Sequence, residues 1–291
     1  MTKRKLRKAA REERRKREKL AEALAAAQKL KKEQEAAKTK ETAPAPDLRS
    51  PMDRLRDATR LAAQVEAAVA SRLHGQPDAI RTLGRLAYAV ALGLPRTRPL
   101  VATFLGPPAT GKTLAATLFA DALRDLGIVS KDEGGSEYVD SQRYGNRSDD
   151  LWGMSGRLVR AIAKHPKAVI VVDELEKGSH DFLMGFLAAL GNGKVIVAGD
   201  TVDFSKATFI FTSNLGHELW LKDSPQSVDL FDLLATAKRP NEEKQYWSTS
   251  ALPREIVSRL ASGEATLFRA LEGHHRIAIL MDAITGGMIH A

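Results

Sequence analysis

Residues 106–113 read Gly106-Pro107-Pro108-Ala109-Thr110-Gly111-Lys112-Thr113, which matches the pattern G-x-x-x-x-G-K-[ST] at every fixed position. The apolar run before this stretch, 100–105, predicts a buried strand, and the run from Lys112 to Leu126 predicts a helix. In that setting the backbone N–H groups of the loop bind phosphate; the alternative is a glycine-rich turn that binds nothing. Lys112 would reach the β- and γ-phosphates and the Thr113 hydroxyl would lie on Mg²⁺, so the stretch predicts a site for ATP and Mg²⁺.

The rest of the chain alternates short apolar runs with helical patterns. Further strands are predicted at 137–140, 168–172, 208–212 and 265–268, with a small hairpin or extended loop at 195–204. Helices are predicted at 52–73, 78–92, 154–164, 182–190 and 270–284. Strands that alternate with helices imply a largely parallel sheet with helices on both faces, the α/β fold of a P-loop NTPase. Ligands of such sheets bind at the carboxyl ends of the strands, where the phosphate loop also lies.

The composition excludes several classes of protein. The 291 residues include no cysteine, which excludes disulfides and thiolate metal sites and suits a reducing compartment. No apolar run approaches the roughly 20 residues that a membrane-spanning helix needs. The N-terminus is charged from Lys3 onward, unlike a secretory signal. We therefore expect a cytoplasmic protein with no membrane span.

The net charge of +9 is confined to the beginning of the chain. Of the 45 basic and 36 acidic residues, 16 and 7 fall in 1–41, which leaves 29 of each in the remainder. Such an arm either contacts nucleic acid, an acidic partner or a membrane surface, or is a solubilising extension. No aromatic residues are interleaved to stack on bases. A Pro/Ala linker follows at 42–51, and we expect the nucleotide-binding core with its leading helices at 52–260.

Polar residues follow two of the predicted strands. Asp173 and Glu174 end the run 168–172, beside the expected phosphate loop. Asp173 is placed to hold Mg²⁺, directly or through water, and Glu174 to orient and deprotonate the attacking water; alternatively, the two acids only mark the end of a strand. Asn214 follows the run 208–212 and would reach the γ-phosphate or that water, or would cap a helix.

Two arginines, Arg254 and Arg259, lie on a predicted helix after Pro253. A guanidinium delivered to the γ-phosphate stabilises the charge of the transition state. Most arginines, however, lie on the surface without such a role. The residues alone do not choose between these alternatives.

The order and spacing of these segments resemble those of the AAA+ ATPases, from about Ala70 to Ile284. Within that family they are most similar to the second ATPase module of the Clp-type (ClpA/ClpB-like) protein unfoldases. Besides the phosphate loop, the resemblance rests on the stretches 74–80 (HGQPDAI), 169–180 (VIVVDELEKGSH) and 202–216, which ends in Thr-Ser-Asn-Leu-Gly. Residues 253–260 are similar to the segment that carries the arginine finger of the family.

The resemblance implies a role for each matching residue. The backbone around Leu73 and His74 would hold the adenine, Asn214 would be the sensor-1 asparagine, and Arg259 would be the finger that acts on the ATP of a neighbouring subunit. The resemblance further implies a homo-oligomer, a hexameric ring that hydrolyses ATP at its subunit interfaces and pulls a polypeptide through a central pore.

The chain departs from the family pattern in three places. No aromatic–glycine pore loop aligns with 143–155, where Tyr144 or Trp152 would replace it, or would instead be packed or exposed. Residues 261–291 are expected to form only a remnant of the C-terminal lid, a strand and one helix without a sensor-2 arginine. The other ATPase module of the family is expected to be absent, with the basic arm in its place. Two alternatives therefore stay open, a nucleic-acid-associated loader or accessory factor and a nucleotide-gated scaffold with weak hydrolysis.

Overall fold

The computed structural model describes residues 50–132, 135–144, 148–153, 156–215, 234 and 252–289. The chain divides into two units, Met1–Ser50 and Pro51–Ala291, and the description below concerns the second. The predictions for the basic arm at 1–41 and for most of the linker lie outside the described residues. Within the described part of the chain, no helix combines the length and the apolar character needed to cross a bilayer.

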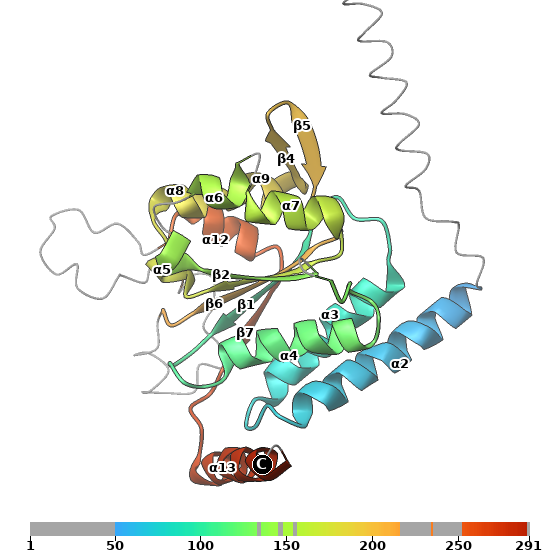
Figure 1. Cartoon of the computed structure of the whole chain (residues 1–291), viewed down its shortest axis with the longest axis vertical. Helices are drawn as coiled ribbons and strands as arrows, with labels where there is room; N and C mark the ends of the chain where they lie inside the picture. The colour runs from blue at the N-terminus through green and yellow to red at the C-terminus, as the bar shows by residue number, and fades with distance from the viewer. Residues whose placement is uncertain are drawn as a thin grey trace, which may run out of the picture. The chain divides into compact units, whose positions relative to one another are not determined.

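A parallel sheet of five strands forms the centre of the second unit, as the alternation of strands and helices predicts (Figure 1). The strands lie in the order β2 (Ser136–Asp140), β3 (Val169–Asp173), β6 (Thr208–Ser213), β1 (Leu100–Leu105), β7 (Glu264–Leu267). Their register aligns Asp140 with Asp173, and Leu105 with both Ser213 and Leu267. The carboxyl ends of the strands therefore meet at one edge, and the residues that follow them lie close together.

Helices cover both faces of this sheet (Figure 1). One face packs against α2 (Pro51–Ala70), α3 (Pro77–Leu92) and α4 (Lys112–Asp125). The other face packs against α6 (Ser148–Trp152), α7 (Arg157–Lys164), α8 (His180–Met184), α9 (Phe186–Asn192) and α12 (Arg254–Leu260). The sequence of strand β3 is apolar because the strand is buried on both faces. Val169 and Val171 enter the core on one face, and Ile170 and Val172 enter the core on the other.

The predicted helix at 182–190 is instead two short helices that meet at Gly185. The side chain of Trp152 packs there, and a Cβ at Gly185 would lie only 2.5 Å from its indole Nε1. The predicted helix at 154–164 begins at Arg157 in α7. The hairpin is confirmed as an antiparallel pair, β4 (Lys194–Val197) and β5 (Asp200–Asp203).

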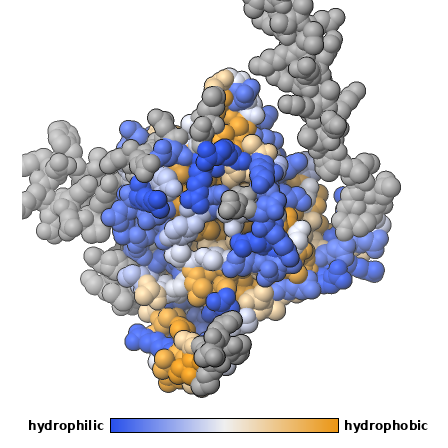
Figure 2. Space-filling view, viewed as in Figure 1, coloured by the Kyte–Doolittle hydropathy of each residue, from blue (hydrophilic) through white to orange (hydrophobic). Residues whose placement is uncertain are grey.

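Three shorter or peripheral elements complete the unit. Helix α5 (Ser141–Tyr144) follows β2, and the 3₁₀ turn η1 (Leu175–Lys177) follows β3. Beyond β7, the helix α13 (Gly273–Ile289) lies below the sheet in Figure 1. Several large apolar side chains of α13 are exposed, among them Ile277, Leu280, Met281 and Ile284. Figure 2 shows an apolar patch in the region of α13.

Candidate active site

The phosphate loop connects β1 to α4 in a conformation that its glycines permit. Gly106 and Gly111 have φ of 147° and 94°, and Ala109 also has a positive φ of 59°. Two features exclude a side chain at Gly106. One is its positive φ, and the other is that a Cβ would lie 2.4 Å from the backbone oxygen of Phe268. The Thr110 hydroxyl donates to the Pro107 carbonyl at 2.8 Å, which closes the turn. The loop is therefore held in one shape by its own residues and by the end of β7.

Lys112 begins α4 and is buried inside this loop. Its Nζ donates to the carbonyl oxygens of Gly106 (2.9 Å) and Pro107 (2.7 Å) and to Oδ1 of Asn214 (2.8 Å). Burial lowers the pKa of Lys112 from its usual value to about 8, although the nearby acids Glu176, Asp173 and Glu174 oppose that shift. The ammonium thus lies where phosphate oxygens could replace the carbonyls as acceptors.

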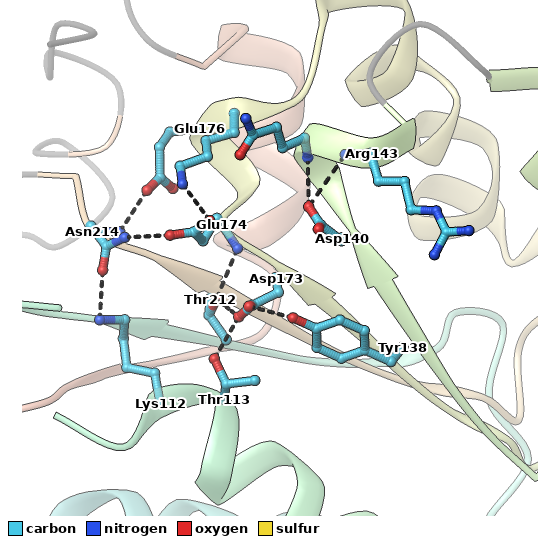
Figure 3. A network of polar contacts seen from close by, with 12 residues as sticks. Lys112, Thr113, Tyr138, Asp140, Arg143, Asp173, Glu174, Glu176, Thr212 and Asn214 are labelled. Atoms are coloured by element: carbon cyan, nitrogen blue, oxygen red, sulfur yellow. Dashed lines mark hydrogen bonds and ion pairs between the residues drawn. The ribbon is translucent and has the colours of Figure 1, made fainter. Parts of the chain in front are cut away.

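Asp173, the last residue of β3, accepts three hydrogen bonds (Figure 3). Its Oδ1 accepts from the hydroxyls of Thr113 (2.7 Å) and Thr212 (2.5 Å), and its Oδ2 accepts from the Tyr138 hydroxyl (2.6 Å). Burial and the bond to Asp173 raise the pKa of Tyr138. Neither Tyr138 nor Thr212 was singled out from the sequence; both lie on the strands that flank β3.

The residues around Asp173 fit an Mg²⁺ ion that is bound together with ATP. Across the described ranges, no group of three or more His, Cys, Asp or Glu side chains forms a metal cage. Thr113 and Asp173 instead bring one hydroxyl and one carboxylate oxygen within 2.7 Å of each other. Mg²⁺ in nucleotide sites is held by one or two such oxygens together with phosphates and water, so this sparse donor set suits it.

Glu174 follows β3 in a left-handed backbone conformation, with φ 51° and ψ 56°. Its backbone N–H donates to the Thr212 hydroxyl at 3.0 Å. The side chain has two partners, because Oε1 accepts from Asn214 Nδ2 at 3.3 Å and Oε2 lies 2.6 Å from Lys177 Nζ. A non-glycine residue in this conformation costs about 1 kcal/mol, and such strain is found chiefly at functional sites.

Asn214 connects the phosphate loop to the acids that follow β3 (Figure 3). Its amide accepts from Lys112 and donates to Glu174, while its backbone N–H donates to Oε1 of Glu176 at 3.0 Å. Glu176 is buried, and its Oε2 has no hydrogen-bond partner among the described residues. The structure therefore brings together Lys112, Thr113, Asp173, Glu174 and Asn214, all predicted from the sequence, and adds Glu176.

Comparison with known proteins decides the family. The AAA domain (Cdc48 subfamily) matches residues 98–262, which is more than half of the chain. The chain belongs to this AAA family. The chain is 30% identical over 165 residues to the chaperone protein ClpB of Gloeobacter violaceus, covering 52% of this chain and 18% of that protein. The chain is also 31% identical over 219 residues to the chaperone protein ClpB 1 of Parasynechococcus marenigrum, covering 72% of this chain and 24% of that protein.

The resemblance to Clp-type AAA+ modules is thereby confirmed, and so is the P-loop NTPase fold. Among solved structures, the S. cerevisiae Hsp104–ADP complex shares the fold with a TM-score of 0.59 and 21% identity, over 87% of this chain and 42% of that one. The chain spans about a fifth of the length of the ClpB relatives that it matches.

The segment predicted to hold adenine lies against the phosphate loop of the AAA domain. Leu73 is buried, and a Cβ at Gly111 would lie 3.0 Å from its Cδ1. Nε2 of His74 lies 2.7 Å from Oδ2 of Asp282 in α13. The nearby Gln76, which the sequence analysis did not single out, donates to the carbonyls of Thr110 (3.1 Å) and Arg269 (2.8 Å) and accepts from the N–H of Arg269 (3.0 Å).

The two arginines of α12 differ in their surroundings. Arg254 is exposed in the first turn, while Arg259 is half-buried in the last. A Cβ at Gly191 of α9 would lie 3.3 Å from Nε of Arg259, and that Nε finds no hydrogen-bond partner in the described part of the chain. Arg259 therefore packs with α9 and is not part of the network in Figure 3.

Both aromatic candidates for a pore loop are packed. The Trp152 ring lies 4.9 Å from Phe186 and 5.7 Å from Phe204, centroid to centroid. The Tyr144 hydroxyl accepts from Arg157 at 3.4 Å, and its ring packs against the same core as Trp152. Of the alternatives drawn from the sequence, packing is the one observed for these two side chains.

Proposed function

We propose that the chain binds ATP with Mg²⁺ and hydrolyses it at the interfaces of an oligomeric ring, most simply a hexamer. The observation that carries this proposal is the network in which Asn214 contacts both Lys112 and Glu174 while Asp173 contacts Thr113. It joins a phosphate-binding cation, a carboxylate base and a pair of oxygen ligands at one edge of the sheet. Such a combination is what phosphoryl transfer to water needs.

In the proposed mechanism each side chain has one task. Lys112 binds the β- and γ-phosphates, while Thr113 and Asp173 hold Mg²⁺, which neutralises phosphate charge when bound. Asn214 orients the attacking water, and Glu174 accepts its proton as the water oxygen bonds to the γ-phosphorus. The bond from the γ-phosphorus to the bridging oxygen breaks, and ADP leaves with that electron pair. Arg259 of a neighbouring subunit stabilises the charge of the transition state.

Turnover should depend on protein concentration if the site is shared between subunits. We expect ATP hydrolysis per subunit to rise with concentration and to level off once the oligomer is complete. Steady-state phosphate release across a dilution series, with the molar mass measured by light scattering in the same samples, checks this. Turnover per subunit that stays constant while the oligomer dissociates would exclude a shared site. Tight ATP binding with negligible turnover throughout would favour the nucleotide-gated scaffold.

ATP binding should also weaken at alkaline pH. Because the pKa of Lys112 is lowered to about 8, its ammonium is charged below that pH and loses its proton above it. Anionic phosphates favour the charged form, so binding above about pH 8 takes up a proton, and the affinity should fall by up to about tenfold per pH unit. Titration with a fluorescent ATP analogue from pH 7 to 9.5 measures this, and the phosphates stay ionised over that range. An affinity that does not change with pH would contradict it.

We further infer that the work of the ring is the remodelling of polypeptides, as the likeness to ClpB chaperones suggests. Binding of fluorescein-labelled casein in the presence of ATPγS, followed by anisotropy, tests this inference. The nucleic-acid alternative predicts instead that the chain binds duplex DNA with a steep dependence on salt, and that removal of residues 1–41 abolishes this binding. Casein binding that does not respond to nucleotide, together with such DNA binding, would favour the alternative.

A further inference from the structure

Lys177 holds the carboxylate to which the proposed mechanism assigns the role of base. The 3₁₀ turn η1 closes with a hydrogen bond from the Lys177 N–H to the Glu174 carbonyl at 2.8 Å. That turn brings the two side chains together, with Nζ of Lys177 2.6 Å from Oε2 of Glu174. The bond to Glu174 raises the pKa of Lys177. The ammonium is therefore a charged donor to the carboxylate oxygen that Asn214 leaves free.

The surroundings of Glu174 leave each carboxylate oxygen occupied. Oε1 accepts from Asn214, whose amide oxygen accepts in turn from Lys112. The neighbouring acid Glu176 accepts through Oε1 from the Asn214 backbone, and the ion pair of Lys177 is with Glu174. Asp173 is similarly engaged by hydroxyl groups. An ammonium on one oxygen and an amide on the other therefore hold the Glu174 carboxylate at both of its oxygens.

We propose that Lys177 is a positioning residue that restrains hydrolysis by holding Glu174 in this arrangement. The proposal rests on the function proposed above. For Glu174 to accept a proton from water, the contact between Lys177 and Oε2 must first open. Opening is inexpensive, because both side chains are partly exposed, at 43% for Lys177 and 34% for Glu174. Exposed ion pairs contribute little to stability, so the effect of Lys177 falls on turnover and not on folding.

The test compares steady-state ATP hydrolysis by the full chain with that of three variants. Lys177→Met keeps the length of the side chain and removes its charge, and we expect kcat to rise about two- to fivefold with an unchanged KM for ATP. Lys177→Arg keeps the charge, and its kcat should equal that of the unmodified chain. Lys194→Met removes an exposed lysine on β4 and should change nothing. Thermal melting checks that all three variants are folded.

The same replacement in a Glu174→Gln background shows whether Lys177 acts through Glu174. We expect Lys177→Met to have no further effect there, since a neutral amide does not form the ion pair. A kcat that is unchanged or lowered in Lys177→Met would overturn the restraining role, as would Lys177→Arg behaving like Lys177→Met. Absence of turnover in both the unmodified chain and Lys177→Met, with ATP still bound, would overturn the proposed function as well.

Discussion

Replacing Arg259 with alanine is expected to lower ATP turnover by about 10³–10⁵-fold while the affinity for ATP stays nearly constant. The reason is that an arginine supplied by a neighbouring subunit contacts the γ-phosphate mainly in the transition state. Arg259 lies in the last turn of α12, where its guanidinium packs beside Gly191 of α9. Phosphate release under saturating ATP, together with nucleotide binding by fluorescence, measures both quantities.

Arg254→Ala is the matched control for this prediction. Arg254 is exposed and lies on the same helix, in its first turn. We expect Arg254→Ala to retain most of the turnover. Because the guanidinium of Arg259 packs beside Gly191, an Arg259→Lys variant, which keeps the charge, separates lost chemistry from lost charge at this position. Equal turnover in the Arg254 and Arg259 variants would remove the finger assignment.

Glu174→Gln is expected to lower turnover by about 10²–10⁴-fold and to leave ATP bound. The amide has the shape of the carboxylate and still accepts from Asn214, but it cannot take a proton from water. Single-turnover chemical quench with labelled ATP isolates the hydrolysis step from product release. The variant should therefore accumulate as a complex with intact ATP.

The replacement Glu176→Gln, two residues further along the chain, provides the comparison. Glu176 is buried and accepts from the Asn214 backbone through one oxygen, a bond that glutamine can preserve. We expect Glu176→Gln to lower turnover by less than about tenfold, since its role is to support Asn214. A larger loss for Glu176→Gln than for Glu174→Gln would exchange the roles of the two acids.

Much of the fold could be predicted because the strands of a parallel sheet are buried on both faces. The run 168–172 is β-branched and apolar, which distinguishes it from a helix with one apolar face. The glycine-rich loop could be predicted equally directly, because its sequence pattern fixes both the backbone shape and the position of Lys112. The acids after β3 and the asparagine after β6 then follow from the rule that strand ends meet at one edge.

The contacts that the sequence did not reveal depend on local geometry that no periodicity encodes. Lys177 reaches Glu174 only because Glu174 is left-handed and the turn after it is 3₁₀. Tyr138 contacts Asp173 from a neighbouring strand, which requires the order of strands in the sheet. The break between α8 and α9 depends on Trp152, a residue that is distant in sequence and that packs at Gly185.

The buried amide of Gln76 ties together two parts of the molecule that the sequence separates by more than 150 residues. It bonds at once to the phosphate loop, through Thr110, and to the backbone of Arg269, which leads from β7 toward α13. Pulling either part away would leave buried polar groups without partners, at about 1–3 kcal/mol for each group. The hydrogen bonds of Gln76 therefore connect the proposed phosphate-binding loop to the segment that follows β7. We therefore expect a displacement of the chain that leads into α13 to strain the hydrogen bonds of Gln76 and, through Thr110, the phosphate loop.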